Sequence, residues 1–407
     1  MIEIIKYDHQ GRGIGTINNK IIFIPNTIPG EIIEYTIEKE KKNFIEGKLT
    51  KIIKKSNKRI EPICPYYNKC GGCQLMHIDY NEQLKFKQEK IENIIHKYVK
   101  KDLKINPIIK SDKIYNYRNK ATFHADNTIG YYQEKTNKII KIDNCLLLDN
   151  KINNILKNLN KIKLHNDEII IRSNNKNTLL YYQNNNNNLK KIDADNICLK
   201  NDIIKGKGYT IEKLNNLQFI ISPTSFFQVN TTQTIKLYDK IKEYANLKKN
   251  DKVLDLYCGT GTIGLYLSDK CNEILGIEIN KEAINNANKN KEINNINNAN
   301  FIAGDATKII NNTHFKPSII IVDPPRSGLN NNMIKDLIKF NAKKIIYISC
   351  DPITLSRDLK ELNKNYSIEI IQPIDMFPNT YHIETIVLLK KCQWYVIKDK
   401  NKKIKNK

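Results

Sequence analysis

The fold is indicated most clearly by ten residues in the second half of the chain, Asp255-Leu256-Tyr257-Cys258-Gly259-Thr260-Gly261-Thr262-Ile263-Gly264. An apolar run precedes the glycines and a helical segment follows them. The glycines match Gly-x-Gly-x-x-Gly, a spacing that lets a ligand approach the backbone closely where a strand ends. The motif alone is a weak signal, so its meaning depends on the residues around it.

Apolar runs alternate with helical segments throughout this half of the chain. The runs are Lys252–Tyr257, Glu273–Ile277, Asn300–Ala303, Ser318–Val322 and Lys344–Ile348. Their alternation predicts a parallel sheet covered by helices on both faces. Three runs end in acids: Glu278 could accept both ribose hydroxyls, Asp305 suits an adenine amino group, and Asp323 opens an Asp-Pro-Pro-Arg turn. A ribose-binding acid fits NAD or S-adenosylmethionine, but the complete set favours a class I methyltransferase.

Cys350 follows the fifth run, in the segment Ser349-Cys350-Asp351-Pro352. In a doubly wound sheet, this strand end opens onto the same crevice as the glycine loop, where a thiolate could attack an electrophilic carbon. Carbon 5 of uracil becomes nucleophilic when a thiolate adds to carbon 6, and a base must then remove the carbon 5 proton. Glu384 begins the next apolar run and could supply that base.

Together these motifs resemble the RNA uracil-C5-methyltransferases that use S-adenosylmethionine. The matching elements stand in the family's order and span essentially the whole chain: Ser225–Asn230, Asp255–Gly261, Asp323–Arg326, Ser349–Pro352, and Met376–Pro378 through His382 to Glu384. The resemblance implies that Cys350 is the nucleophile and Glu384 the proton acceptor. It also implies a cofactor site lined by Gln228, Tyr257, Gly259, Thr262, Glu278, Asp305 and Asp323.

Four cysteines in the middle of the chain form a second candidate site. Cys64, Cys70 and Cys73 are close in sequence, and Cys145 follows far downstream. Four thiolates can hold zinc or an iron–sulfur cluster, and spacing alone leaves iron–sulfur, zinc and coincidence open. The rRNA-modifying branch of the family carries a 4Fe-4S cluster on this pattern. The resemblance therefore implies a 4Fe-4S cluster held by these four cysteines.

Apolar and polar residues alternate between Gly, Pro and Asn turns in the first fifty-odd residues, which predicts a small OB-like β-barrel. This segment resembles a TRAM domain, an RNA-binding barrel. We therefore expect an α/β multidomain chain. Its parts are a TRAM-like barrel over 1–57, an iron–sulfur-containing α+β middle domain over 58–216, a Rossmann-like class I methyltransferase domain over 217–397, and a basic tail over 398–407.

The chain is strongly basic, with 67 Lys and Arg against 43 Asp and Glu and a formal net charge of +24. Such an excess attracts phosphate backbones, although a general enrichment in Lys, Asn and Ile contributes part of it. We therefore expect RNA as the partner. The resemblance links the barrel and the cluster to the rRNA branch, so the expected substrate is a loop or single-stranded segment of 23S rRNA. A uridine in the T loop of tRNA is the alternative.

No stretch approaches eighteen consecutive apolar residues, and the first residues are too polar for a signal peptide. We therefore expect a cytoplasmic monomer without membrane contact.

Two other functions fit parts of the sequence. A catalytically silent, metal-stabilised RNA-binding protein would have no reason to keep Cys350, Glu384 and Gln228 together. The other is a methyltransferase directed at adenine or cytosine. Methylation of the adenine amino group needs no such cysteine and prefers an aromatic residue at the position of Arg326.

Overall fold

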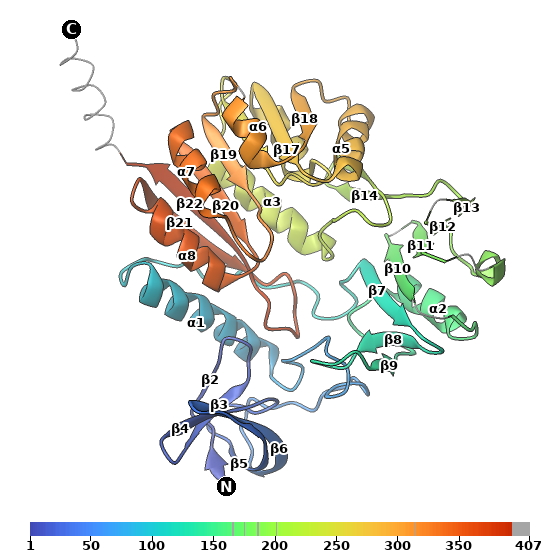
Figure 1. Cartoon of the computed structure of the whole chain (residues 1–407), viewed down its shortest axis with the longest axis vertical. Helices are drawn as coiled ribbons and strands as arrows, with labels where there is room; N and C mark the ends of the chain where they lie inside the picture. Colours follow the sequence, from blue (N-terminus) through green and yellow to red (C-terminus); the bar gives the residue numbers. More distant parts are fainter. Residues whose placement is uncertain (165–166, 175, 185–186, 201, 313, 393–407) are drawn as a thin grey trace.

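The computed structural model describes residues 1–392 apart from 165–166, 175, 185–186, 201 and 313. The chain forms a small barrel, a middle sheet and a C-terminal sheet, in that order (Figure 1). The predicted basic tail over 398–407 lies outside the described residues. Among the helices that are described, none is long and apolar enough to cross a membrane.

Six strands form the N-terminal barrel, in the order β1-β5-β6-β4-β3-β2. They are β1 (Ile2–Glu3), β2 (Lys6–Tyr7), β3 (Gly13–Ile17), β4 (Lys20–Ile24), β5 (Ile32–Glu40) and β6 (Phe44–Lys54). The short first segment pairs with β5 through β1 and with β3 through β2, which closes the sheet and removes its free edges. The core of the barrel consists of buried isoleucines, Ile2, Ile4, Ile22, Ile24, Ile33 and Ile45.

Helix α1 (Tyr80–Tyr98) lies between the barrel and the C-terminal sheet (Figure 1). Phe86 of α1 packs edge-on against Tyr7 of the barrel, with ring centroids 5.1 Å apart. Ile91, further along the helix, enters the core of the C-terminal sheet. A single helix thus contacts both the barrel and the sheet.

The middle part is a seven-stranded, mostly antiparallel sheet in the order β13-β12-β11-β10-β7-β8-β9. Its elements are β7 (Lys120–Ala125), β8 (Ile129–Tyr132), β9 (Ile139–Lys141), α2 (Asn150–Leu159), β10 (Asp167–Ser173), β11 (Thr178–Tyr182), η1 (Asn187–Lys191), β12 (Asn196–Leu199) and β13 (Ile203–Lys205). The apolar side of α2 packs on this sheet in a core that includes Phe123 and Ile169. The middle part therefore has the predicted α+β character.

A hairpin, β14 (Thr210–Leu214) and β15 (Leu217–Ile221), leads into a second seven-stranded sheet, ordered β18-β17-β16-β19-β20-β22-β21. The elements of this part are α3 (Thr231–Ala245), β16 (Lys252–Leu256), α4 (Thr262–Leu267), η2 (Ser268–Lys270), β17 (Glu273–Glu278), α5 (Lys281–Ile293), β18 (Ala299–Ala303), α6 (Ala306–Asn312), β19 (Ile319–Val322), α7 (Asn331–Phe340), β20 (Lys344–Ser349), α8 (Pro352–Leu362), β21 (Tyr366–Ile374) and β22 (Glu384–Lys391). Strands β16 to β20 are parallel, and β22 is antiparallel to both its neighbours. Each of the five predicted apolar runs coincides with one of the parallel strands.

Helices cover both faces of this sheet, as the alternation predicted. Helices α3, α4 and α5 pack on one face, and α1, α6, α7 and α8 pack on the other (Figure 1). Consecutive residues of β16 show the division, because Val253 belongs to the first core and Leu254 to the second. In a sheet buried on both faces, ligands are bound beyond the carboxyl ends of the strands.

Candidate active site

The carboxyl ends of the parallel strands meet at one edge of the C-terminal sheet. Glu278 is the last residue of β17, and the loops at this edge carry Gly259, Asp305, Asp323 and Cys350. Strand β22 starts at the same edge because it runs in the opposite direction, and its first residue is Glu384. The fold thus brings together residues that are predicted from separate segments of the sequence.

The glycine loop after β16 has a backbone that suits close approach of a ligand. Tyr257, Gly259 and Gly261 have φ angles of 61°, 53° and 76°. A Cβ atom on Gly261 would lie 2.7 Å from the ring of Phe301, whereas a Cβ atom on Gly259 would have no neighbour within 4 Å. Gly261 is therefore needed for packing, and Gly259 borders open space. A positive φ at Tyr257 is costly and typical of functional sites.

Two acids organise the neighbouring loops. Glu278, half-buried at the end of β17, accepts hydrogen bonds from the backbone N–H of Gly259 at 3.2 Å and of Asn280 at 2.9 Å. Asp305 is exposed, and its Oδ1 accepts a hydrogen bond from the N–H of Thr307 at 2.8 Å. Hydrogen bonding by Thr307 lowers the pKa of Asp305. A carboxylate has two oxygens and several lone pairs, so both side chains can accept further hydrogen bonds from hydroxyl or amino groups.

Thr262 and Gln228, two further residues of the predicted cofactor site, make contacts of different kinds. Thr262 begins α4, and its Oγ1 lies 2.7 Å from the hydroxyl oxygen of Tyr238. Gln228 is buried between β15 and α3, and its carbonyl oxygen accepts from Asn119 Nδ2 at 3.3 Å. The contact with Asn119 ties the C-terminal part to the middle sheet.

Burial raises the pKa of two carboxyl groups at the carboxyl ends of the strands, those of Asp323 and Asp255. The pKa of Asp323 rises to about 7 through burial. The pKa of Asp255 also rises to about 7, chiefly through burial. A hydrogen bond from the N–H of Gly264 lowers this pKa, and the charges of Asp323 and Glu278 raise it. Asp255 is not among the predicted site residues, although it opens the motif. Mutually repelling acids of this kind favour a cationic ligand, because its charge stabilises their ionised forms.

Cys350 is the first residue after β20, and Glu384 is the first residue of the neighbouring strand β22. The last residue pair between β20 and β22 is Ser349 with Thr385, so the next step of the antiparallel register sets Cys350 opposite Glu384. Opposite residues have side chains on the same face, with Cα atoms about 4.5–5.5 Å apart. The charge of Glu384 accordingly contributes to the raised pKa of Cys350, after the larger effect of burial.

Arg326 is a further charged residue at this pair. Burial, followed by the charge of Glu384, raises the pKa of the Cys350 thiol to about 12. The pKa of Glu384 is raised well above its usual value by burial and then by Asp323. The positive charge of Arg326 opposes both shifts and so favours a thiolate on Cys350. The sequence places Arg326 in the Asp-Pro-Pro-Arg turn but does not indicate that its charge acts on Cys350.

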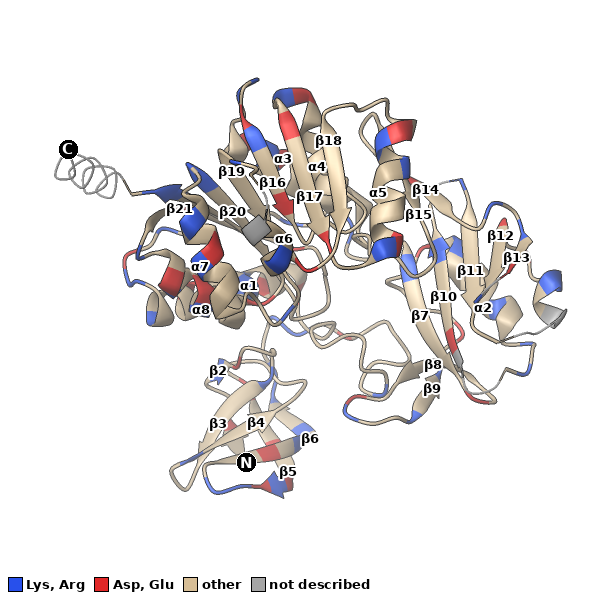
Figure 2. Cartoon of the chain, turned by 45° about the horizontal axis from the view of Figure 1, so that its top comes forward, with Lys and Arg blue, Asp and Glu red and all other residues tan. Residues whose placement is uncertain are grey.

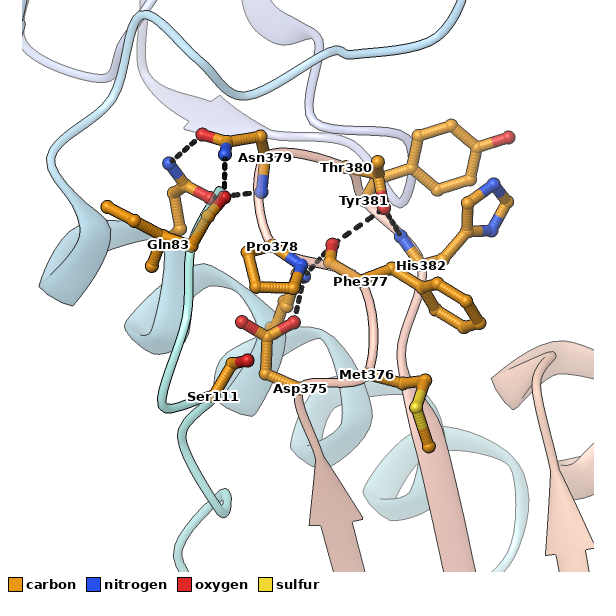
Figure 3. A network of polar contacts seen from close by, with 12 residues as sticks. Gln83, Ser111, Asp375, Met376, Phe377, Pro378, Asn379, Thr380, Tyr381 and His382 are labelled. Carbon is orange, nitrogen blue, oxygen red and sulfur yellow. Dashed lines mark hydrogen bonds and ion pairs between the residues drawn. The ribbon is translucent and has the colours of Figure 1, made fainter. Parts of the chain in front are cut away.

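Helix α1 holds the loop that leads into Glu384 (Figure 3). Gln83 Oε1 accepts from the N–H of Asn379 at 2.9 Å, and Gln83 Nε2 donates to Asn379 Oδ1 at 3.2 Å. Lys87 Nζ donates to Asp375 Oδ1 at 2.6 Å, and both of these side chains are fully buried. These contacts fix the start of β22. No sequence motif indicates them.

The four predicted metal-binding cysteines are brought to one place in the middle part. Cys64, Cys70, Cys73 and Cys145 all line a cavity of about 700 Å³. Burial raises the pKa of the Cys73 thiol, and the charges of the other three thiols raise it further. Within the described residues, no three metal-ligating side chains converge on a position that could hold a single metal ion. Zinc would need its four sulfur ligands about 3.8 Å from one another.

Two further features of this cavity fit an anionic group larger than one ion. Arg118 lines the cavity, its Nε is buried, and this atom has no hydrogen-bond partner among the described residues. The backbone N–H of Gly72 donates to Cys70 Sγ at 3.4 Å, and a Cβ atom on Gly72 would lie 3.4 Å from the same sulfur. A 4Fe-4S cluster with four thiolate ligands is anionic and accepts hydrogen bonds at its sulfurs. The residues present therefore fit such a cluster.

The strand order and the glycine loop define the C-terminal part as a Rossmann-like methyltransferase domain. The chain belongs to the tRNA (Uracil-5-)-methyltransferase family, whose family model matches residues 174–392, and the TRAM domain model matches residues 2–50. Both expected resemblances are confirmed. An uncharacterized RNA methyltransferase of Clostridium tetani is 36% identical, over 93% of this chain and 94% of that protein. One of Staphylococcus aureus is also 36% identical, over 95% and 96%.

A solved structure resembles the whole chain. It is the tRNA (uracil-54, C5)-methyltransferase of Pyrococcus abyssi in complex with S-adenosyl-L-homocysteine, with a TM-score of 0.78 and 28% sequence identity. The alignment covers 96% of this chain and all of that one. The likeness therefore extends over the barrel, the middle sheet and the C-terminal sheet together.

Proposed function

We propose that this protein transfers a methyl group from S-adenosylmethionine to carbon 5 of a uridine in RNA, with Cys350 as the nucleophile and Glu384 as the proton acceptor. The observation that carries the proposal is the register of β20 and β22, which sets Cys350 opposite Glu384 at the edge that holds the glycine loop. A thiol and a buried carboxyl group on one face are what addition to carbon 6 and proton removal from carbon 5 require.

The chemistry divides between the two side chains. The Cys350 thiolate adds to carbon 6, which turns carbon 5 into a nucleophile, and Arg326 stabilises the thiolate before the addition. When bound, S-adenosylmethionine would supply the methyl group that carbon 5 takes, with the sulfonium keeping the electron pair of its broken S–CH3 bond and leaving as S-adenosylhomocysteine. Glu384 then accepts the carbon 5 proton, and the electrons of that C–H bond re-form the double bond as the bond between carbon 6 and Cys350 breaks. The thiolate is regenerated, and the proton leaves through Glu384.

Residues around the glycine loop fit the cofactor. Gly259 borders open space, and we propose that Glu278 accepts from the ribose hydroxyls and Asp305 from the adenine amino group; the hydrogen bonds of these two acids to the neighbouring loops support this. Asp323 and Asp255 carry the raised pKa values that a cationic sulfonium would lower. We also propose Gln228, Tyr257 and Thr262 as lining residues, as the family resemblance implies.

Cofactor affinity is expected to depend on pH. Asp323 and Asp255 have raised pKa values of about 7, so they are mostly protonated at pH 6 and mostly ionised at pH 8. If binding needs one of them ionised, the affinity for S-adenosylmethionine rises about tenfold over this interval. Calorimetry at both pH values measures the change. S-adenosylhomocysteine, which lacks the sulfonium charge, is the control and should change less. An affinity that stays constant or falls with pH would contradict the proposed role of the acids.

We further propose that Cys64, Cys70, Cys73 and Cys145 hold a 4Fe-4S cluster, in a middle domain over 58–216 between a barrel over 1–57 and a methyltransferase domain over 217–397. The shared cavity and the buried Arg118 support this. The cluster would join residues 64–73 to residue 145 and so stabilise the middle domain.

Protein purified without oxygen is expected to be brown and to contain about four irons per chain. Replacing Cys73 with serine should remove the colour and lower the melting temperature, because the cluster loses a ligand. Cys198→Ser is the matched control, because Cys198 is buried in the same part of the chain but lies away from the cavity. Stoichiometric zinc without iron in anaerobically prepared protein would refute the cluster.

We propose 23S rRNA as the substrate, in a loop or single-stranded segment from which the target base can leave its stack. A TRAM barrel in the same chain as the catalytic part supports an extended RNA contact, and Lys and Arg residues, coloured blue along the ribbon, occur in all three parts (Figure 2). A uridine of tRNA is the second candidate, favoured by the likeness to the Pyrococcus abyssi enzyme. The proposal includes action in the cytoplasm as a monomer.

Nucleoside mass spectrometry of RNA from cells with and without the gene tests the substrate. The expected result is loss of 5-methyluridine from 23S rRNA, with tRNA unchanged. Loss from tRNA alone would replace the rRNA proposal with the tRNA one and leave the chemistry intact. Loss of 5-methyluridine from neither RNA would contradict the proposed function.

A further inference from the structure

A second cavity lies between the middle sheet and the C-terminal part; it shares Arg118 with the cysteine cavity but is lined by none of the four cysteines and by neither Cys350 nor Glu384. Its volume is about 590 Å³, within the range of small-molecule sites. The segment that ends at Asn119, just before β7, and Ser173 at the end of β10 contribute to one wall, and the β14–β15 hairpin and the start of α3 contribute to the other. Its rim includes three exposed lysines, Lys113, Lys176 and Lys213.

The wall of this cavity contains buried polar groups whose hydrogen bonds are incomplete. Asn119 is 8% exposed, and its Oδ1 has no hydrogen-bond partner among the described residues. Ser173 is fully buried, and its Oγ also has none within the part of the chain that is described. An unpaired buried polar atom costs about 1–3 kcal/mol. Two such atoms in the lining of one cavity indicate a place where a ligand, rather than the protein, completes the hydrogen bonds.

Glu212 gives the cavity its chemical preference. This carboxyl group lines the cavity, is 6% exposed, and lies 3.5 Å from Asn119 Nδ2, a weak contact. Arg172 is its charged neighbour, but the Arg172 guanidinium donates its hydrogen bonds to the carbonyl oxygens of Pro223 and Ser225. The oxygens of Glu212 and Asn119 are thus acceptors that suit a ligand with N–H groups.

We propose that this cavity binds an amino-bearing nucleobase of the substrate RNA, with guanine the best match, at a position other than the target uridine. N1–H and the 2-amino group of guanine can donate to both oxygens of one carboxylate, and uracil has no such pair of donors. The rim lysines would contact the adjoining phosphates. This inference rests on the proposed action on RNA. It adds a second base-reading site beside Asn119, the residue that also contacts Gln228.

The test uses the full-length protein saturated with S-adenosylhomocysteine, so that nucleotides cannot occupy the cofactor site. Binding of guanosine, cytidine, adenosine and uridine 5′-monophosphates is measured by equilibrium dialysis. We expect guanosine monophosphate to bind about tenfold more tightly than uridine monophosphate. Glu212→Gln should abolish this preference, and Ser173→Ala should weaken binding of guanosine monophosphate. Glu369→Gln, an exposed substitution on β21, should change neither.

Equal binding of all four nucleotides, or no binding of any, would overturn the proposal. A preference for guanosine that Glu212→Gln leaves intact would do so as well, since it would place the base elsewhere. Binding of magnesium ions without any nucleotide preference would reassign the cavity to a cation. None of these results depends on methyl transfer. The inference about the cavity and the proposed function can therefore fail separately.

Discussion

Replacing Cys350 with alanine is expected to lower methylation of RNA by at least about 10³-fold, because the reaction loses the nucleophile that activates carbon 5. The same variant should bind S-adenosylmethionine with nearly unchanged affinity. Cys350 follows β20 and lies opposite Glu384. Among the described residues, no hydrogen bond joins Cys350 to the glycine loop. Methyl transfer from labelled cofactor and calorimetry measure the two effects.

Cys198→Ala is the control for simple loss of a thiol, because Cys198 is buried in the middle sheet. It should methylate at the wild-type rate. A Cys350→Ala protein that methylates within tenfold of wild type would remove Cys350 from the mechanism. Loss of both methylation and cofactor binding would instead mean that the substitution disturbs the strand edge as a whole.

Replacing Glu384 with glutamine is expected to have a different consequence, because addition and methyl transfer precede proton removal. The glutamine cannot accept the carbon 5 proton, so the thioether bond to Cys350 should persist and turnover should fall about 10²–10⁴-fold. RNA should remain attached to the protein through denaturing electrophoresis. The side chain is buried at the start of β22, and glutamine preserves its size, so folding should be retained.

The double variant Cys350→Ala with Glu384→Gln separates covalent attachment from tight binding. It should form no adduct that survives denaturation. Glu369→Gln, on the exposed side of β21, should turn over normally without trapped RNA. Free methylated product from Glu384→Gln, with no adduct, would assign proton removal to another group.

The site residues at the carboxyl ends of the parallel strands are predictable from the sequence for a physical reason. Parallel strands end on one side of a sheet, so residues such as Glu278, Asp323 and Cys350 must meet there once the alternation of strands and helices is recognised. The position of Glu384 relative to Cys350 cannot be predicted from this rule alone. Its strand is antiparallel, and only the pairing of β22 with β20 sets it opposite Cys350.

The supporting contacts could not be predicted in the same way. Gln83 and Asn379 are 296 residues apart and belong to segments with no shared pattern, yet they hydrogen-bond to each other. Lys87 lies in a polar stretch of α1 that gives no sign of a buried ion pair with Asp375. The cavity that joins Asn119, Ser173 and Glu212 likewise depends on packing between two sheets. Such features arise from tertiary structure, which local sequence does not encode.

Reaction with RNA that contains 5-fluorouridine tests the central claim most directly. The enzyme should add Cys350 to carbon 6 and methylate carbon 5, and it should then stop, because fluorine cannot leave carbon 5 as a proton does. Digestion and mass spectrometry should identify one modified peptide, containing Cys350 and carrying a methylated fluorouridine nucleotide. Methylated fluorouridine that is free of protein, or an adduct on any other cysteine, would contradict the account.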